Sequence, residues 1–147
     1  MKRSLVLLSF FSIFFFYLLI TLIGCTNEVP KEFDLSQLTR VDVQNFTGDN
    51  YDNETIVTEE EKIKALRGLF ERIEWEQNVK AEMTRKEDVK ATFFFTYDKN
   101  MPERLFEYFI WFNQGDASAT IIDREKNAIG TLDKEESEKL KDILVNN

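Results

Sequence analysis

The chain has 147 residues, of which 19 are basic, 27 are acidic and none is histidine, so its formal net charge is −8. This charge argues against nucleic acid as a partner, because binding phosphates requires an excess of Lys and Arg. The lack of histidine excludes Ser-His-Asp catalysis. No glycine-rich phosphate loop is present, and we expect no cofactor.

The N-terminal segment ends in the only cysteine of the chain. Lys2 and Arg3 precede an apolar run over residues 5–23, and Gly24 and Cys25 follow it. This arrangement resembles the lipobox of bacterial lipoprotein signal peptides. The resemblance implies cleavage after Gly24 and a diacylglyceryl group on the Cys25 thiol. It also implies a location at the cell membrane, on the extracytoplasmic side.

A retained membrane anchor is the alternative interpretation of this segment. The apolar run is longer than the stretch of about 7–15 residues in signal peptides, and it reaches the roughly 17–25 residues of a membrane-spanning helix. Both interpretations leave the basic start in the cytoplasm and export the rest. With Cys25 bound to lipid, the exported part has no thiol or imidazole, which excludes Cys-His catalysis, thiol–disulfide exchange and ordinary zinc or copper sites.

We predict three parts: a lipoprotein signal peptide over residues 1–24, a tether over 25–38 and a single α+β domain over 39–147. Removing the signal peptide leaves 17 basic and 27 acidic residues, a net charge of −10. This charge argues against adhesion of the folded part to anionic lipid headgroups. The lipid on Cys25 is therefore the predicted link to the membrane.

The first half of the domain combines a strand and a helix. Residues 40–46 alternate apolar and polar side chains, which predicts a strand. Residues 48–53 are rich in Asp, Asn and Gly and predict a loop. A helix follows over 59–74, with Thr58 as N-cap and Glu61 completing a capping box. Its apolar residues form one stripe: Ile63, Leu66, Leu69, Phe70 and Ile73.

Residues 89–97 and 104–113 predict an aromatic hairpin joined by a turn that contains Pro102. Pairing Phe95 with Phe106 aligns the apolar faces of the two strands.

Two short strands, over residues 118–123 and 128–132, and a final helix capped by Asp133 complete the chain. The buried side of that helix is predicted to carry Leu140, Ile143 and Leu144. The predicted fold class is α+β. It is a twisted antiparallel sheet of about five strands, with two amphipathic helices on one face and the order β-α-β-β-β-β-α.

Two segments carry a resemblance to a family. Ile56 to Leu66 reads I-V-T-E-x-E-K-I-x-A-L, and Gly130 to Leu140 reads G-T-L-D-x-E-x-x-x-x-L. With the aromatic hairpins between them, these segments are similar to the small YhfM-like lipoproteins of bacilli, over about residues 38–146. The resemblance implies no assigned activity and no catalytic residue.

The mixed face of the hairpin supplies the candidate partner surface, which consists of Phe94, Phe109 and Trp111. If both helices cover the other face, these aromatic side chains are exposed, and exposed apolar patches mark partner sites. The partner would be another protein of the cell envelope. The alternative is that Trp75 and residues 76–86 fold back over them.

The remaining candidates for a site give weaker functional signals. Residues 49–54 carry several oxygen ligands, but their spacing predicts a turn rather than a calcium loop. Gly130 predicts a bulge or a close approach of backbones. Two pairs of acids are candidates for hydrolysis: Glu103 with Glu107, and Asp116 with Asp123.

The functional prediction is a lipid-anchored extracytoplasmic lipoprotein that acts as a non-enzymatic binding or accessory module. The alternative is a hydrolase of cell-wall polymers that uses paired carboxylates. The oligomeric state is not predicted.

Overall fold

The computed structural model describes residues 34–146, so Cys25 and the predicted signal peptide lie outside the described residues. In chain order its elements are the 3₁₀ turn η1 (Leu35–Gln37), β1 (Leu38–Thr47), β2 (Asn50–Tyr51), β3 (Thr55–Val57), α2 (Glu60–Glu71), β4 (Glu74–Gln77), β5 (Val89–Phe95), β6 (Arg104–Phe112), β7 (Ala119–Asp123), β8 (Ala128–Leu132) and α3 (Lys134–Leu144). In this part of the chain, no helix is both long and apolar enough to cross a membrane.

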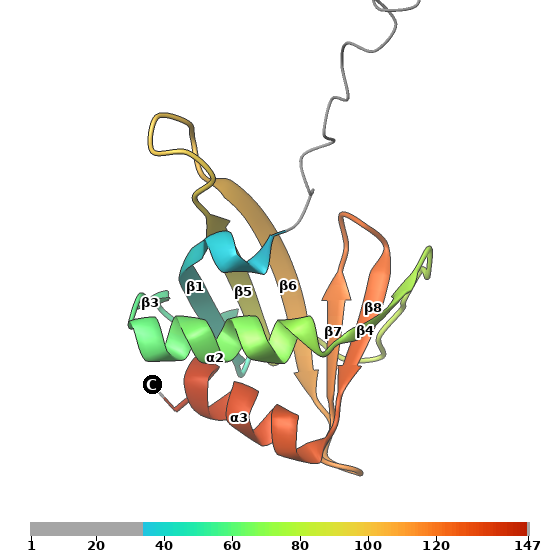
Figure 1. The fold of residues 1–147 in the computed structure, drawn as a ribbon. Coiled ribbons are helices and arrows are strands. Elements are labelled where there is room, and N and C mark those ends of the chain that lie inside the picture. Colours follow the sequence, from blue (N-terminus) through green and yellow to red (C-terminus); the bar gives the residue numbers. More distant parts are fainter. Residues whose placement is uncertain (1–33, 147) are drawn as a thin grey trace, which may run out of the picture. The chain divides into compact units, whose positions relative to one another are not determined.

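The sheet has eight antiparallel strands in the order β2-β1-β5-β6-β7-β8-β4, and β3 also pairs with β1. Figure 1 shows α2 crossing the sheet from β3 toward β4, with α3 beside it. The predicted sheet of about five strands with two helices on one face is therefore wrong. Strands β2 and β3 are too short to give an alternating pattern, and β4 follows α2 closely, beginning at Glu74, which the sequence placed at the end of the predicted helix.

The start of the domain also differs from the prediction. Leu35 and Leu38 were assigned to the tether, but both are buried, and Leu38 opens β1. Asp34 caps η1, because its side chain accepts a hydrogen bond from the Ser36 amide at 3.0 Å. The folded part therefore includes residues before 39.

The core lies between α2 and the central strands. The Phe70 ring of α2 lies 4.5 Å from the Phe93 ring and 5.0 Å from the Tyr108 ring, measured between centroids. Ile63, Leu66 and Leu69 of α2 are buried as well. The predicted apolar stripe thus packs on the sheet, as its helical spacing requires.

The aromatic hairpin has the predicted faces but a different register. Phe93 lies opposite Phe106, and Phe95 lies opposite Arg104, which is two residues from the predicted pairing. A shift of two residues keeps every side chain on its own face, because side chains alternate with a period of two. The apolar pattern therefore fixed the faces and could not distinguish these two registers.

Of the two predicted helix N-caps, one is confirmed and one is wrong. Asp133 caps α3 by accepting a hydrogen bond from the Glu136 amide at 2.9 Å, as predicted. The N-cap of α2 is Glu59 rather than Thr58, and it makes no side-chain capping bond. The predicted capping box is therefore wrong.

Gly130 lies where β8 passes the end of α2. A Cβ atom there would overlap Ile73 Cγ2 and lie 3.2 Å from Trp75 Cε3. The glycine accommodates neighbouring side chains, whereas the sequence predicted a bulge or a close approach of backbones.

Candidate functional site

The outer face of the sheet, opposite α2, carries a second small core. Phe109, Trp111 and Ile122 are buried together, and Ala81 and Ile129 pack against them. Trp111 is 1% exposed and Phe109 is 8% exposed. The indole Nε1 of Trp111 donates a hydrogen bond to the Arg85 carbonyl at 3.0 Å. The structure therefore excludes exposure of these two side chains and agrees with the alternative that residues 76–86 fold back over them, although Trp75 packs with Phe70 and Tyr108 on the other face.

The topology explains this cover. Strand β4 lies at one edge of the sheet, whereas β5 lies beside β1 near the other edge. Because α2 occupies the inner face, the connection over residues 78–88 returns across the outer face. Near its start, the Val79 amide donates a hydrogen bond to the Asn127 carbonyl, in the β7–β8 connection, at 2.9 Å, and Ala81 then packs against the outer core. We name residues 78–88 the return segment.

Phe94, the third residue of the predicted surface, is half-buried on β5. The Arg40 guanidinium carbon lies 3.9 Å from its ring centroid. Arg40 also donates two hydrogen bonds to Asp42, at 2.8 and 2.7 Å. A paired cation therefore covers part of this ring, and the three predicted aromatic residues form no common exposed patch.

The return segment brings a buried carboxylate onto the outer face. The Tyr51 hydroxyl donates a hydrogen bond to Glu87 Oε1. Lys86 Nζ lies 3.5 Å from Oε1, and Arg124 Nη2 lies 3.9 Å from Oε2. The Glu87 side chain is 2% exposed. We name these four residues the Glu87 cluster. No spacing along the sequence indicates it, because its members come from three distant segments.

The electrostatics keep Glu87 ionised. Burial raises the pKa of Glu87, but the hydrogen bonds from Tyr51 and from its own backbone, with the charges of Lys86 and Arg124, bring the pKa below its ordinary value. Burial raises the pKa of Tyr51, and its hydrogen bond to Glu87 raises it further. At neutral pH the cluster therefore holds a carboxylate and a neutral phenol.

A cavity of about 300 Å³ adjoins the cluster. It is lined by Ala81, Met83, Arg85, Lys86, Glu87, Trp111, Ile122 and Arg124. The Arg124 guanidinium lies over the Phe109 ring, 3.8 Å from its centroid. The cavity thus combines charged groups with an aromatic wall.

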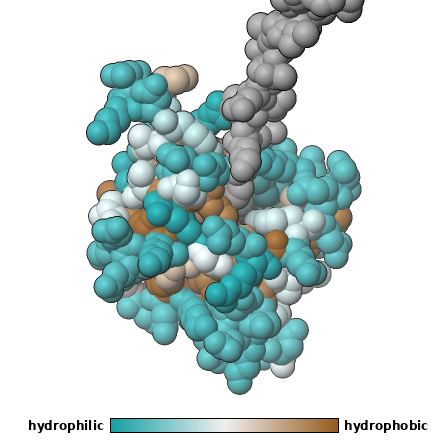
Figure 2. All heavy atoms as spheres, in the orientation of Figure 1, coloured by the Kyte–Doolittle hydropathy of each residue, from teal (hydrophilic) through white to brown (hydrophobic). Residues whose placement is uncertain are grey.

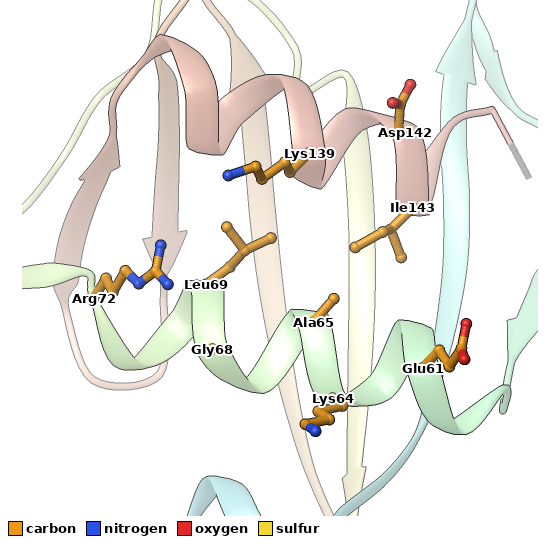
Figure 3. Close-up of a pocket in the computed structure, with 9 residues that line it drawn as sticks. All are labelled: Glu61, Lys64, Ala65, Gly68, Leu69, Arg72, Lys139, Asp142 and Ile143. Carbon is orange, nitrogen blue, oxygen red and sulfur yellow. The ribbon is translucent and has the colours of Figure 1, made fainter.

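A larger groove, of about 630 Å³, lies between the two helices. Its lining consists of Glu61, Lys64, Ala65, Gly68, Leu69, Arg72, Lys139, Asp142 and Ile143. Leu69 and Ile143 extend toward each other from opposite helices (Figure 3). A Cβ atom placed on Gly68 would meet nothing within 4 Å, so the groove is open there. Hydrophobic atoms also appear between the helices on an otherwise largely hydrophilic face (Figure 2).

The charges of this α2–α3 groove are separated along its length. Arg72 and Lys139 lie toward one end, and Glu61 and Asp142 lie toward the other (Figure 3). Both cations also pair with acids of α3: Arg72 Nη1 lies 3.2 Å from Glu136 and Lys139 Nζ lies 2.6 Å from Glu135. The groove therefore has an apolar middle, with two ion-paired cations toward one end and two acids toward the other, and Lys64 adds a further cation from α2.

The predicted acid pairs have local partners. Glu107 pairs with Lys90 at 2.8 Å, and Glu103 accepts a hydrogen bond from Thr96 Oγ1 at 3.2 Å. Asp116 accepts two hydrogen bonds from Ser118, at 3.0 and 2.7 Å. Asp123 accepts one from the Lys126 amide at 2.9 Å.

Over residues 49–54, Asp52 accepts a hydrogen bond from Thr47 Oγ1 at 2.5 Å, and residues 50–51 form β2. Among the residues that the structure describes, no group of three or more His, Cys, Asp or Glu side chains could hold a metal ion.

Comparisons with known proteins identify a related fold. No protein-family model and no curated protein sequence matches the chain. A crystal structure of a thioesterase-like protein from Clostridium sporogenes is similar, with a TM-score of 0.54 and 18% sequence identity. The match covers 78% of this chain and 100% of that chain. At this identity the likeness shows the fold alone.

This likeness corrects the functional prediction at one point. We predicted that the chain is not an enzyme. Its fold is shared with a protein described as thioesterase-like, and that finding overturns the prediction.

Proposed function

We propose that this protein is a lipid-anchored lipoprotein on the extracytoplasmic side of the cell membrane, whose domain binds an acyl-containing amphiphile in the α2–α3 groove. The groove itself carries the proposal, because it joins an apolar middle to an end that carries Arg72 and Lys139. The anchor rests on the sequence Gly24-Cys25 after a long apolar run.

The dimensions and lining of the groove suit such a ligand. Its volume of about 630 Å³ lies within the range of roughly 300–1,000 Å³ that is usual for small-molecule sites. Ala65 and Gly68 leave room above the floor formed by Leu69 and Ile143. Each methylene group that is buried there would contribute about 0.8 kcal/mol to binding.

The separated charges would orient the ligand. An anionic group at one end of an acyl chain is repelled by Glu61 and Asp142. At the other end it would compete with Glu136 for Arg72 and with Glu135 for Lys139. The description of the similar solved structure as thioesterase-like supports an acyl-containing ligand, because a thioester carries an acyl group.

Filling the groove tests this proposal. The Gly68→Leu variant of the lipidated protein should lose most of its affinity for a fluorescent fatty acid, measured by titration. Gly115→Leu is the matched control, because a Cβ atom at either glycine meets nothing within 4 Å and Gly115 lies outside the groove. Equal affinity of Gly68→Leu and the unsubstituted protein would contradict the proposal.

The anchor has its own test. Mass spectrometry of the mature protein should find a diacylglyceryl group on an N-terminal Cys25, and Cys25→Ser should abolish lipid labelling. A mature protein that begins at Cys25 with a free thiol would contradict lipid anchoring.

Thioester hydrolysis is the second candidate function. The observation that favours it is an ionised, buried Glu87 beside a cavity, on a fold shared with a thioesterase-like protein. Glu87 would accept a proton from water as the water oxygen bonds to the carbonyl carbon. The carbon–sulfur bond would then break, and the leaving thiolate would take that proton. The lowered pKa makes Glu87 a weak base, so we rank this function second.

The assay is thiol release from an acyl thioester. Activity that Glu87→Gln abolishes and Glu103→Gln retains would support hydrolysis at the Glu87 cluster. Activity that survives in Glu87→Gln would exclude this residue as the base.

A further inference from the structure

Exposed hydrophobic side chains gather at one turn of the sheet. The large hydrophobic residues that are exposed in the described part of the chain are Ile56, Met83, Tyr97, Met101 and Leu105. Three of these belong to the β5–β6 connection or its base: Tyr97 is 37% exposed, Met101 is 62% exposed and Leu105 is 51% exposed. We name residues 97–105 the hairpin tip. It projects from one end of the sheet (Figure 1).

The folded domain begins beside this tip. The Asp34 amide donates a hydrogen bond to the Tyr97 hydroxyl at 3.3 Å, and the Thr96 amide donates one to the Gln37 carbonyl at 3.0 Å. Leu38, the first residue of β1, lies opposite Phe95, the last residue of β5. The chain therefore enters the domain at the end of the sheet that carries the hairpin tip.

The length of chain before Asp34 limits how far this end can lie from the membrane. Only residues 26–33 separate Cys25 from Asp34. A fully extended chain spans about 3.3–3.6 Å per residue, so the reach from Cys25 to Asp34 is at most about 30 Å. With a lipid on Cys25, the entry end of the domain stays near the membrane surface.

The charge of the tip also differs from that of the rest of the exported chain. The tip contains Asp98, Lys99, Glu103 and Arg104, so its net charge is zero. The exported chain as a whole carries −10. An anionic lipid surface repels the domain as a whole, but it repels a neutral tip far less. Apolar side chains can then enter the headgroup region.

We propose that the hairpin tip contacts the phospholipid surface, with Met101 and Leu105 entering the headgroup region. This inference rests on the proposed lipid anchor, which brings the tip to the membrane. Contact at this point fixes the orientation of the domain and turns the opposite end of the sheet away from the bilayer.

Tryptophan quenching tests the contact. The full-length Met101→Trp variant, lipidated in cells and reconstituted into vesicles of brominated phosphatidylglycerol and phosphatidylcholine, should lose most of the emission added by the new tryptophan. Ile56→Trp is the matched control, because Ile56 is 55% exposed and lies on β3 rather than on the tip. The unsubstituted protein gives the background from Trp75 and Trp111.

The outcomes separate this inference from the proposed anchor. Quenching at position 101 well above that at position 56 supports contact of the tip with lipid. A diacylglyceryl group on Cys25 with equal quenching at both positions, or with none, overturns the contact and leaves the anchor intact. A protein without lipid on Cys25 overturns both. A tip that binds another protein instead gives no quenching in protein-free vesicles and contradicts the inference.

Discussion

The two faces of the sheet are covered by different kinds of structure. On the inner face a regular helix, α2, packs an apolar stripe against the aromatic side chains of β5 and β6. On the outer face the return segment, which contains no helix or strand, covers Phe109 and Trp111. Individual polar contacts hold this segment to the sheet: Arg85 donates to the Phe112 carbonyl at 3.0 Å, Asp88 accepts from the Phe112 amide at 2.6 Å, and Glu87 accepts from Tyr51.

The two covers are therefore stabilised by different interactions. The inner face depends on buried area, to which many side chains contribute. The outer cover depends on a few directed bonds, and loss of the bond from Tyr51 removes a partner from the buried Glu87 carboxylate. The same contrast divides the candidate sites, because the α2–α3 groove is mainly apolar and the cavity of the Glu87 cluster is charged.

Removing a ring from the inner core should have the largest effect. Phe93→Ala should lower the free energy of unfolding by about 3–5 kcal/mol, because Phe93 is 0% exposed and contacts both Phe70 and Tyr108. Denaturant titration measures this loss. Ile56→Ala, at an exposed position, should change stability by about 0.5 kcal/mol or less. Similar losses in the two variants would refute the assignment of the inner core.

The sequence predicted the elements that carry repeated apolar signals. Both helices, β1 and the strands from β5 to β8 were expected within a few residues of their observed bounds. Strand β4 was missed because Trp75 is its only large apolar residue and α2 precedes it at once. Without β4, the sequence could not decide whether Phe109 and Trp111 are exposed or covered by residues 76–86. The structure decides this question through its topology, because the chain must return from β4 at one edge to β5.

The candidate sites were less predictable than the fold. The Glu87 cluster joins Tyr51, residues 86–87 and Arg124, which no spacing along the chain relates. The α2–α3 groove depends on how two separately predicted helices pack. The sequence signal for this groove was a pair of small residues, Ala65 and Gly68, three residues apart on one face of α2. Such a pair indicates either a close approach of the second helix or an open space beside it. The lipid attachment at Cys25 lies outside the described residues and stays a prediction.

Breaking the Glu87 cluster should cost less than breaking the inner core. Tyr51→Phe should lower the free energy of unfolding by about 1.5–3 kcal/mol, the usual value of a hydrogen bond to a charged group. The return segment should also become more susceptible to proteolysis. Tyr97→Phe is the control, because that hydroxyl accepts an exposed hydrogen bond. A stable Tyr51→Phe variant with unchanged proteolysis would show that the cluster does not hold the segment.

Acidification should weaken the same cluster. The pKa of Glu87 is lower in the folded protein than its ordinary value of 4.5, so its ionisation stabilises the fold above pH 4.5. This contribution is lost as the pH falls from 4.5 through the folded pKa. The difference in unfolding free energy between the unsubstituted protein and Glu87→Gln should therefore shrink between pH 7 and pH 3. A difference that is constant over this range would contradict the lowered pKa.

The smallest expected effect is a gain in stability at the open groove. Gly68 lies in the interior of α2, and a Cβ atom there meets nothing within 4 Å. Gly68→Ala should therefore raise the free energy of unfolding by up to about 1 kcal/mol, because alanine restricts the unfolded chain and favours helix. Gly130→Ala should lower it by about 1–3 kcal/mol, because the new Cβ atom overlaps Ile73. Opposite signs in the two variants would confirm that one glycine borders open space and the other a packed core. A loss of stability in Gly68→Ala would mean that the helices close over the groove and that the space available to a ligand is smaller than the structure indicates.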